Sequence, residues 1–60
     1  MGFKRGDRVR CLAGHYRGFK GWVQAVNENG SLLIRVPVMS GPRISDRYVT
    51  LLPKNVEAVA

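Results

Sequence analysis

The sequence predicts an all-β fold, a small barrel of five short strands. Runs of Val, Ile and Leu alternate with polar residues at the period of two that half-buried strands show. Seven Gly and three Pro separate these runs as turn signals, and no longer segment keeps the periodicity of a helix. Closing so small a sheet into a barrel would remove its exposed edges. Because 60 residues make one domain at most, we expect residues 1–60 to form one complete small domain.

The first expected strand is Arg8–Leu12. Val9 and Cys11 would face the core, while the two arginines between and before them would face the solvent, because successive side chains of a strand point to opposite faces. A glycine-containing loop at residues 13–19 separates this strand from the second one, which we expect at Lys20–Asn27.

The second expected strand carries the single tryptophan of the chain. If Val23 points inward, its neighbour Trp22 points outward. Val26 breaks the alternation, which predicts a bend or bulge near that position. The strand should end at a hairpin turn over Asn27–Gly30, because an Asn-Gly pair tolerates the positive φ that such turns require.

The second half of the chain continues the β pattern. Leu32, Ile34 and Val36 share one face of the third expected strand. Pro37 cannot donate to a ladder, so this end of the strand should lie at an edge or leave the sheet. In chain order we expect a strand at Ser31–Val38, a loop at Met39–Pro42, a strand at Arg47–Leu52, a tight turn of the 3₁₀ kind at Pro53–Asn55 and a closing strand at Val56–Val59.

The balance of charge indicates a polyanionic partner. Ten Lys and Arg face four Asp and Glu, which gives a net charge of +6. A domain this basic carries the electrostatic footprint of a nucleic-acid binder. The apolar runs are much shorter than the roughly 20 residues of a membrane helix, so we expect no membrane partner.

Metal, disulfide and catalytic chemistry find little support. Cys11 has no second cysteine to pair with, which fits a reducing cytoplasm, and we expect it to be a small buried apolar residue. Cys11 and His15 make only half of a zinc site. No nucleophile stands beside His15, and the acids are scattered in expected turns, where Asp46 and Arg47 would make local contacts. We therefore expect a non-catalytic protein without metal or cofactor.

Glycines and a basic residue recur at fixed intervals between the first two strands. Gly14, the pair Arg17-Gly18 and Gly21 stand between the hydrophobic residues of the two strands. This pattern resembles the KOW motif of ribosomal large-subunit proteins and NusG-type transcription elongation factors, although Lys is commoner where Arg17 stands. The resemblance covers about residues 6–36. It implies an SH3-like barrel and a role in binding RNA or a nucleoprotein complex.

The loop and the outward strand positions supply the candidate site. Aromatic side chains can stack on exposed bases while cations hold phosphates. The alternative for Tyr16, Phe19 and Trp22 is a cluster that packs over one end of the barrel. The candidate nucleic-acid-binding residues are Arg8, Arg10, His15, Tyr16, Arg17, Lys20, Trp22 and Arg35, to which Lys4 and Arg5 could add charge.

Three functions follow from these features. The first is a cytoplasmic, monomeric module that binds RNA, in preference to DNA, or a ribonucleoprotein, with an affinity that falls steeply with salt. The second is an accessory subunit that docks on a protein through the loop aromatics. The third is an oligomeric enzyme similar to type II dihydrofolate reductases, because Gly6–Arg10 resembles the first strand of those enzymes. The segment that lines their pore has no match in this sequence, which has Arg47–Thr50 at the comparable place.

Overall fold

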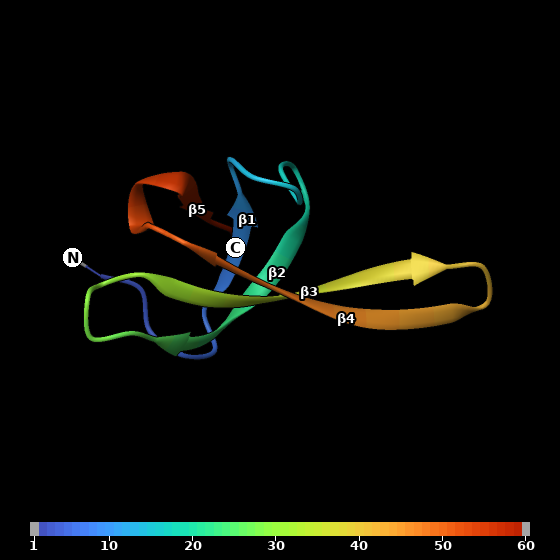
Figure 1. The fold of residues 1–60 in the computed structure, drawn as a ribbon, viewed down its shortest axis with the longest axis horizontal. Helices are drawn as coiled ribbons and strands as arrows, with labels where there is room; N and C mark the ends of the chain where they lie inside the picture. Colours follow the sequence, from blue (N-terminus) through green and yellow to red (C-terminus); the bar gives the residue numbers. More distant parts are fainter. Residues whose placement is uncertain (1, 60) are drawn as a thin grey trace.

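One curved antiparallel sheet makes up the fold (Figure 1). The structure, a computed structural model, describes residues 2–59, so Met1 and Ala60, the two ends of the expected domain, lie outside the described residues. The elements are β1 (Arg8–Cys11), β2 (Lys20–Val26), β3 (Leu32–Ser40), β4 (Arg43–Leu51), the 3₁₀ turn η1 (Pro53–Asn55) and β5 (Val56–Ala58).

The strand order is β4-β3-β2-β1-β5, and all neighbouring strands are antiparallel. The prediction of an all-β, five-stranded SH3-like fold with a 3₁₀ turn near the C-terminus is confirmed. The expected closure by the last strand is wrong, because β5 pairs with β1, lies at the opposite end of the sheet from β4 and is not joined to it by a hydrogen-bonded ladder, so the barrel is open. The 3₁₀ turn η1 instead connects these two edge strands along the chain.

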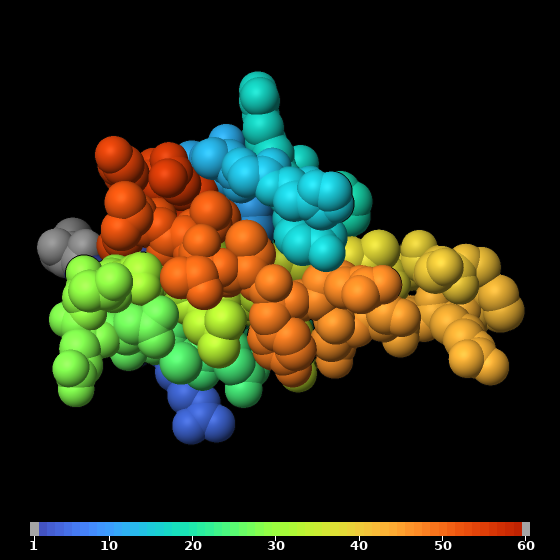
Figure 2. All heavy atoms as spheres, in the orientation of Figure 1, coloured from blue at the N-terminus to red at the C-terminus, as the bar shows by residue number. Residues whose placement is uncertain are grey.

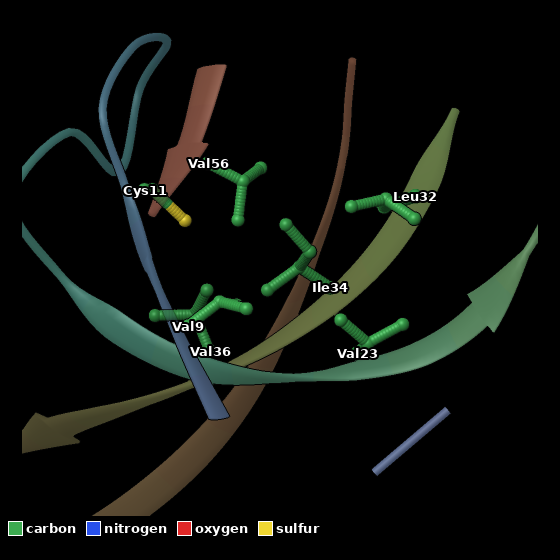
Figure 3. Close-up of a cluster of buried hydrophobic side chains, with 7 residues drawn as sticks. All are labelled: Val9, Cys11, Val23, Leu32, Ile34, Val36 and Val56. Carbon is green, nitrogen blue, oxygen red and sulfur yellow. The ribbon is translucent and has the colours of Figure 1, made fainter. Parts of the chain in front are cut away.

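Alternation along the strands builds the core as expected (Figure 3). Every second residue of β1 and of the first half of β3 is buried, which confirms the predicted inward faces of both strands. Cys11 is fully buried, as predicted for a small apolar residue. The side chains that converge in the centre are Val9, Cys11, Val23, Leu32, Ile34, Val36 and Val56.

β3 and β4 form a longer hairpin than the sequence predicts, and it projects away from the other strands at the right of Figure 1. The ladder continues up to the pair Ser40 and Arg43. The expected loop at Met39–Pro42 is therefore wrong for its first two residues. The expected turn contacts of Asp46 and Arg47 are also wrong, because both residues lie within β4.

A two-residue turn explains this length. Gly41 has a φ of 62° at the first central position between the strands, which fits the type II′ turn that matches the twist of a hairpin. Strand pairing can therefore continue to Ser40 and Arg43, the two residues that flank the turn. Met39 and Ile44 face each other near the tip and are 74% and 67% exposed. The sequence here therefore lacks the alternation of buried and exposed residues that indicates a strand.

Pro37 lies at an edge, one of the two positions predicted for it. It pairs with Asp46 of β4, whereas the ladder between β2 and β3 ends at Arg35. β3 thus has a single neighbour at Pro37, and its missing N–H removes no bond from a central ladder.

The β2–β3 connection is the predicted hairpin, with a short turn closed by Gly30. The Gly30 N–H donates to the Asn27 carbonyl over 2.9 Å, and Gly30 alone in this turn has a positive φ, 88°. The side chain of Asn29 accepts hydrogen bonds from the backbone and hydroxyl of Ser31, at 3.0 and 2.6 Å. The bulge expected near Val26 lies just before it, where the register shifts between Val23 and Ala25.

Candidate nucleic-acid interface

The register of the sheet places four side chains in one row on its outer face. Arg8 of β1 lies opposite Trp22 of β2, Trp22 lies opposite Arg35 of β3, and Arg35 lies opposite Tyr48 of β4. Directly opposed residues of antiparallel strands point to the same face and lie about 5 Å apart. We call Arg8, Trp22, Arg35 and Tyr48 the outer row.

Trp22 holds the two arginines of the outer row. The guanidinium carbon of Arg8 lies 5.7 Å from the centre of the indole ring, and that of Arg35 lies 5.5 Å from it. Both distances are within the range of an attractive cation–π contact. Trp22 points outward as predicted but is only partly exposed, because these two side chains cover part of its ring. The indole therefore fixes two cations in place.

These two cations have no acidic partner within residues 2–59. The one ion pair of the described chain joins Arg10 to Glu57 of β5, over 3.7 Å, and includes neither Arg8 nor Arg35. The Nε atom of Arg35 is buried and makes no hydrogen bond. A guanidinium that is held by an aromatic ring and is not neutralised by a carboxylate can donate its hydrogen bonds to an anion.

Arg10 and Lys20 lie beside the outer row and widen the basic face. They oppose each other across β1 and β2, two residues along each strand from Arg8 and Trp22. Glu57 opposes Arg10 on the other side and offsets part of its charge. The structure thus brings together five of the predicted residues, Arg8, Arg10, Lys20, Trp22 and Arg35, on one face of the sheet.

The other three predicted residues lie in the loop between β1 and β2, at the top of Figure 2 in blue to cyan. The Gly18 N–H donates to the Cys11 carbonyl over 2.7 Å, and the Cys11 N–H donates to the Phe19 carbonyl over 2.9 Å. These bonds tie the loop to the end of β1. Gly14 and Gly18 have φ values of 85° and 89°, which non-glycine residues rarely adopt.

The loop aromatics form a small cluster that differs from the expected alternative, because it includes His15 and does not include Trp22. His15 and Tyr16 make an edge-to-face contact with ring centres 5.0 Å apart, and Tyr16 makes a second one with Phe19 at 6.0 Å. Tyr16 also packs against the core, whereas Phe19 is 45% exposed and His15 and Arg17 are exposed. Tyr16 therefore has a packing role in the fold, and the sequence alone could not distinguish this role from a binding role.

Tyr48 is the residue of the outer row that the sequence analysis missed. Its side chain is 56% exposed. The strand that holds it was expected, but its pairing with Arg35 depends on the β3–β4 register. A signal was available: counting back from a two-residue turn at Gly41-Pro42 aligns these two residues.

Residues 2–59 contain no pocket and no group of three or more His, Cys, Asp or Glu side chains that could hold a metal ion. None of the helical structure in this range is long and apolar enough to cross a membrane. Burial raises the pKa of the Cys11 thiol.

Comparison with known proteins agrees with the motif and its place in the fold. The family model described as the KOW motif matches residues 5–36, which include β1, the loop, β2 and the first half of β3. No curated protein matches the chain. KOW motifs occur in RNA-binding proteins and in proteins of transcription and translation, and the motif is not itself an enzymatic one. The match extends over more than half of the 60 residues, and the chain belongs to the KOW-motif family.

Proposed function

We propose that this protein is a non-catalytic module that binds RNA, alone or within a ribonucleoprotein, through the outer face of β1, β2 and β3. The observation that carries the proposal is the arrangement of Arg8 and Arg35 around Trp22, at 5.7 and 5.5 Å, without an acidic partner among residues 2–59. The family supports RNA over DNA, because its motif recurs in RNA-binding proteins. The reducing compartment that a free Cys11 fits supports a cytoplasmic location.

The arrangement favours phosphate binding for two reasons. Fixing an arginine before binding lowers the entropy that is lost when it meets its ligand. Arg8, Arg10, Lys20 and Arg35 also place four cations on the outer face of β1, β2 and β3, where Glu57 of β5 offsets only part of the charge of Arg10. Each phosphate that such a face neutralises releases condensed counterions, so the affinity should fall as salt rises.

The test uses the fluorescence of Trp22, the single tryptophan of the chain. Single-stranded RNA and duplex DNA would be titrated into the protein at several salt concentrations. We expect RNA to change the fluorescence and to bind with a log–log salt slope of about −0.7 for each phosphate contact. The absence of binding to either polymer at low salt would refute the proposal.

A matched pair of variants locates the interface. Arg35→Gln and Arg43→Gln each remove one positive charge, but only Arg35 belongs to the outer row, while Arg43 lies at the tip of the hairpin. We expect Arg35→Gln to weaken RNA binding and to reduce the salt slope by about one contact, roughly 0.7. Equal losses in the two variants would show attraction to overall charge and would contradict the assignment of this face.

One observation favours a second function, docking on a protein through the loop. Phe19 is 45% exposed next to the Tyr16 ring, as an anchor for a partner's pocket would be. Under this alternative, Phe19→Ala would abolish association with a partner complex while Arg35→Gln would leave it intact. The opposite pattern is expected under the RNA-binding proposal.

A further inference from the structure

We propose that Tyr48 is a base-stacking position at the end of the outer row, and that the face therefore selects single-stranded over duplex nucleic acid. The inference rests on the proposed function, because it names the form of nucleic acid that the same face would bind. It reassigns the stacking role that the sequence suggested for Trp22 and Tyr16 to a residue of β4.

The environments of the aromatic rings support this reassignment. Trp22 is flanked by two guanidinium groups, and Tyr16 packs on the core and contacts two other rings. Tyr48 has no such contact with an aromatic ring or a cation within residues 2–59, and it is 56% exposed. Its ring is thus the one in the outer row that remains open to a flat ligand.

The neighbours of Tyr48 supply the phosphate site that a stacked nucleotide needs. Arg35 lies directly opposite Tyr48, and its guanidinium is held on its other side by Trp22. Four neighbouring strands span about 14 Å at the usual spacing. That distance corresponds to at most about four nucleotides at the rise of about 3.4 Å along a stacked strand, and to fewer where the strand is extended and a base turns onto Tyr48. A short single strand that crosses β4 to β1 would therefore meet Tyr48, Arg35 and Arg8 in succession.

Charge indicates the direction of this path. Asp46 lies two residues from Tyr48 on the same strand and therefore on the same face, toward the tip of the hairpin. Its carboxylate would repel a phosphate that continued along the hairpin. The cations Arg35 and Arg8 lie on the other side, toward β1. The strand is therefore expected to cross the sheet and not to follow the hairpin.

Stacking on Tyr48 distinguishes single strands from duplexes. In a duplex the faces of the bases are covered by their neighbours in the stack, so a side chain on a sheet surface meets phosphates and groove edges. A single strand can turn a base face onto an aromatic ring. An interface that used only the arginines would bind both forms, whereas one that uses the Tyr48 ring would prefer the single strand.

The test compares three probes: a labelled single-stranded oligouridylate of eight nucleotides, an RNA duplex of the same length, and inorganic polyphosphate, which has no bases. Tyr48→Ala removes the ring, and Tyr48→Phe retains it. Thr50→Ala serves as the matched control, because Thr50 is an exposed residue two positions away on the same face of β4. Thermal unfolding of each variant shows that it is folded at the temperature of the titration.

We expect the single strand to bind more tightly than the duplex. Tyr48→Ala should lose about tenfold in affinity for the single strand, the effect of one stacked base, with no change for polyphosphate. Tyr48→Phe and Thr50→Ala should bind the single strand as the unmodified protein does. Equal affinities for single strand and duplex, or an unchanged affinity in Tyr48→Ala, would overturn this inference and leave the proposed function standing. Binding of none of the probes would overturn both.

Discussion

Replacing Gly21 by alanine tests how closely the fold and the site depend on each other. Gly21 is buried in β2, where this strand lies close to the backbone of Arg35 in β3. A Cβ atom at this position would overlap the carbonyl oxygen of Arg35 and lie 3.2 Å from Ile34 Cγ2. Backbone cannot rotate away as a flexible side chain can. The cost of this overpacking should therefore reach the upper end of the usual range, about 3 kcal/mol or more.

This loss is large for so small a chain. About 0.05–0.15 kcal/mol per residue gives roughly 3–9 kcal/mol for the whole fold. At about 4–8 °C for each kcal/mol, Gly21→Ala should lower the Tm by at least about 12 °C. The displaced segment carries Arg35, so the fluorescence of Trp22 in the folded variant should also change. Thermal unfolding followed by circular dichroism measures the first effect, and the emission spectrum measures the second.

Gly30→Ala provides the matched control. Gly30 has a φ of 88°, but no heavy atom lies within 4 Å of the point where an alanine Cβ would sit, so this variant adds backbone strain without a clash. It should lose about 1–2 kcal/mol and leave the Trp22 spectrum unchanged. If Gly21→Ala were no less stable than Gly30→Ala, the close approach of β2 and β3 would not be what requires a glycine at Gly21.

Three further predictions concern the core, the charged face and pH. Ile34→Ala, at a fully buried position, should lose about 2–5 kcal/mol in chemical denaturation, and a loss below about 1 kcal/mol would contradict the assigned core. Glu57→Gln should change stability by less than about 1 kcal/mol, because its partner Arg10 and Glu57 itself are 39% and 51% exposed. It should nevertheless strengthen RNA binding at low salt, and weaker binding would be inconsistent with the proposed face. Burial raises the pKa of Cys11 above its ordinary value of 9.0. At a pH below this ordinary value the buried neutral thiol contributes fully to the stability of the fold. This contribution is lost as the pH rises through the raised pKa of the folded state, because ionisation of the thiol favours the unfolded chain. The difference in unfolding free energy between the unmodified protein and Cys11→Ala should shrink at alkaline pH, and a constant difference would refute this.

The sequence predicted the fold well because most strands are half-buried. Alternation in the sequence indicates directly which face of a strand packs on the core. It is clear in β1, where Val9 and Cys11 alternate with arginines, and in β3, where Leu32, Ile34 and Val36 alternate with less buried residues. The far half of the hairpin has no core to face. Met39 and Ile44 are therefore exposed on a part of the hairpin that the ladder and the turn at Gly41 hold without a core, and periodicity could not identify them.

The sequence predicted the face on which five of the eight candidate residues lie, but not which residues contact one another. Alternation correctly assigned Arg8, Trp22 and Arg35 to the outer face, because each residue's face depends only on its own strand. Which residues touch depends on how neighbouring strands are aligned, and a single sequence carries little information on that. The covering of Trp22 by two arginines and the pairing of Tyr48 with Arg35 both belong to this second kind of fact.

Register therefore determines what the outer row can bind. Trp22 meets arginines on both sides because β2 lies between β1 and β3, and a slip of one residue in either ladder would turn the neighbouring arginine toward the core face. The residues that fix the alignment carry no charge: Gly21 sets the approach of β2 to β3, the register shift lies between Val23 and Ala25, and Gly30 closes the turn. Substitution of Gly21, or loss of the register shift between Val23 and Ala25, should separate the cations from the indole without altering any residue of the outer row, whereas Gly30→Ala should keep the alignment. A loss of RNA binding in such variants would reflect displaced arginines, so it must be measured beside the Trp22 spectrum before any of these residues is counted as an RNA contact.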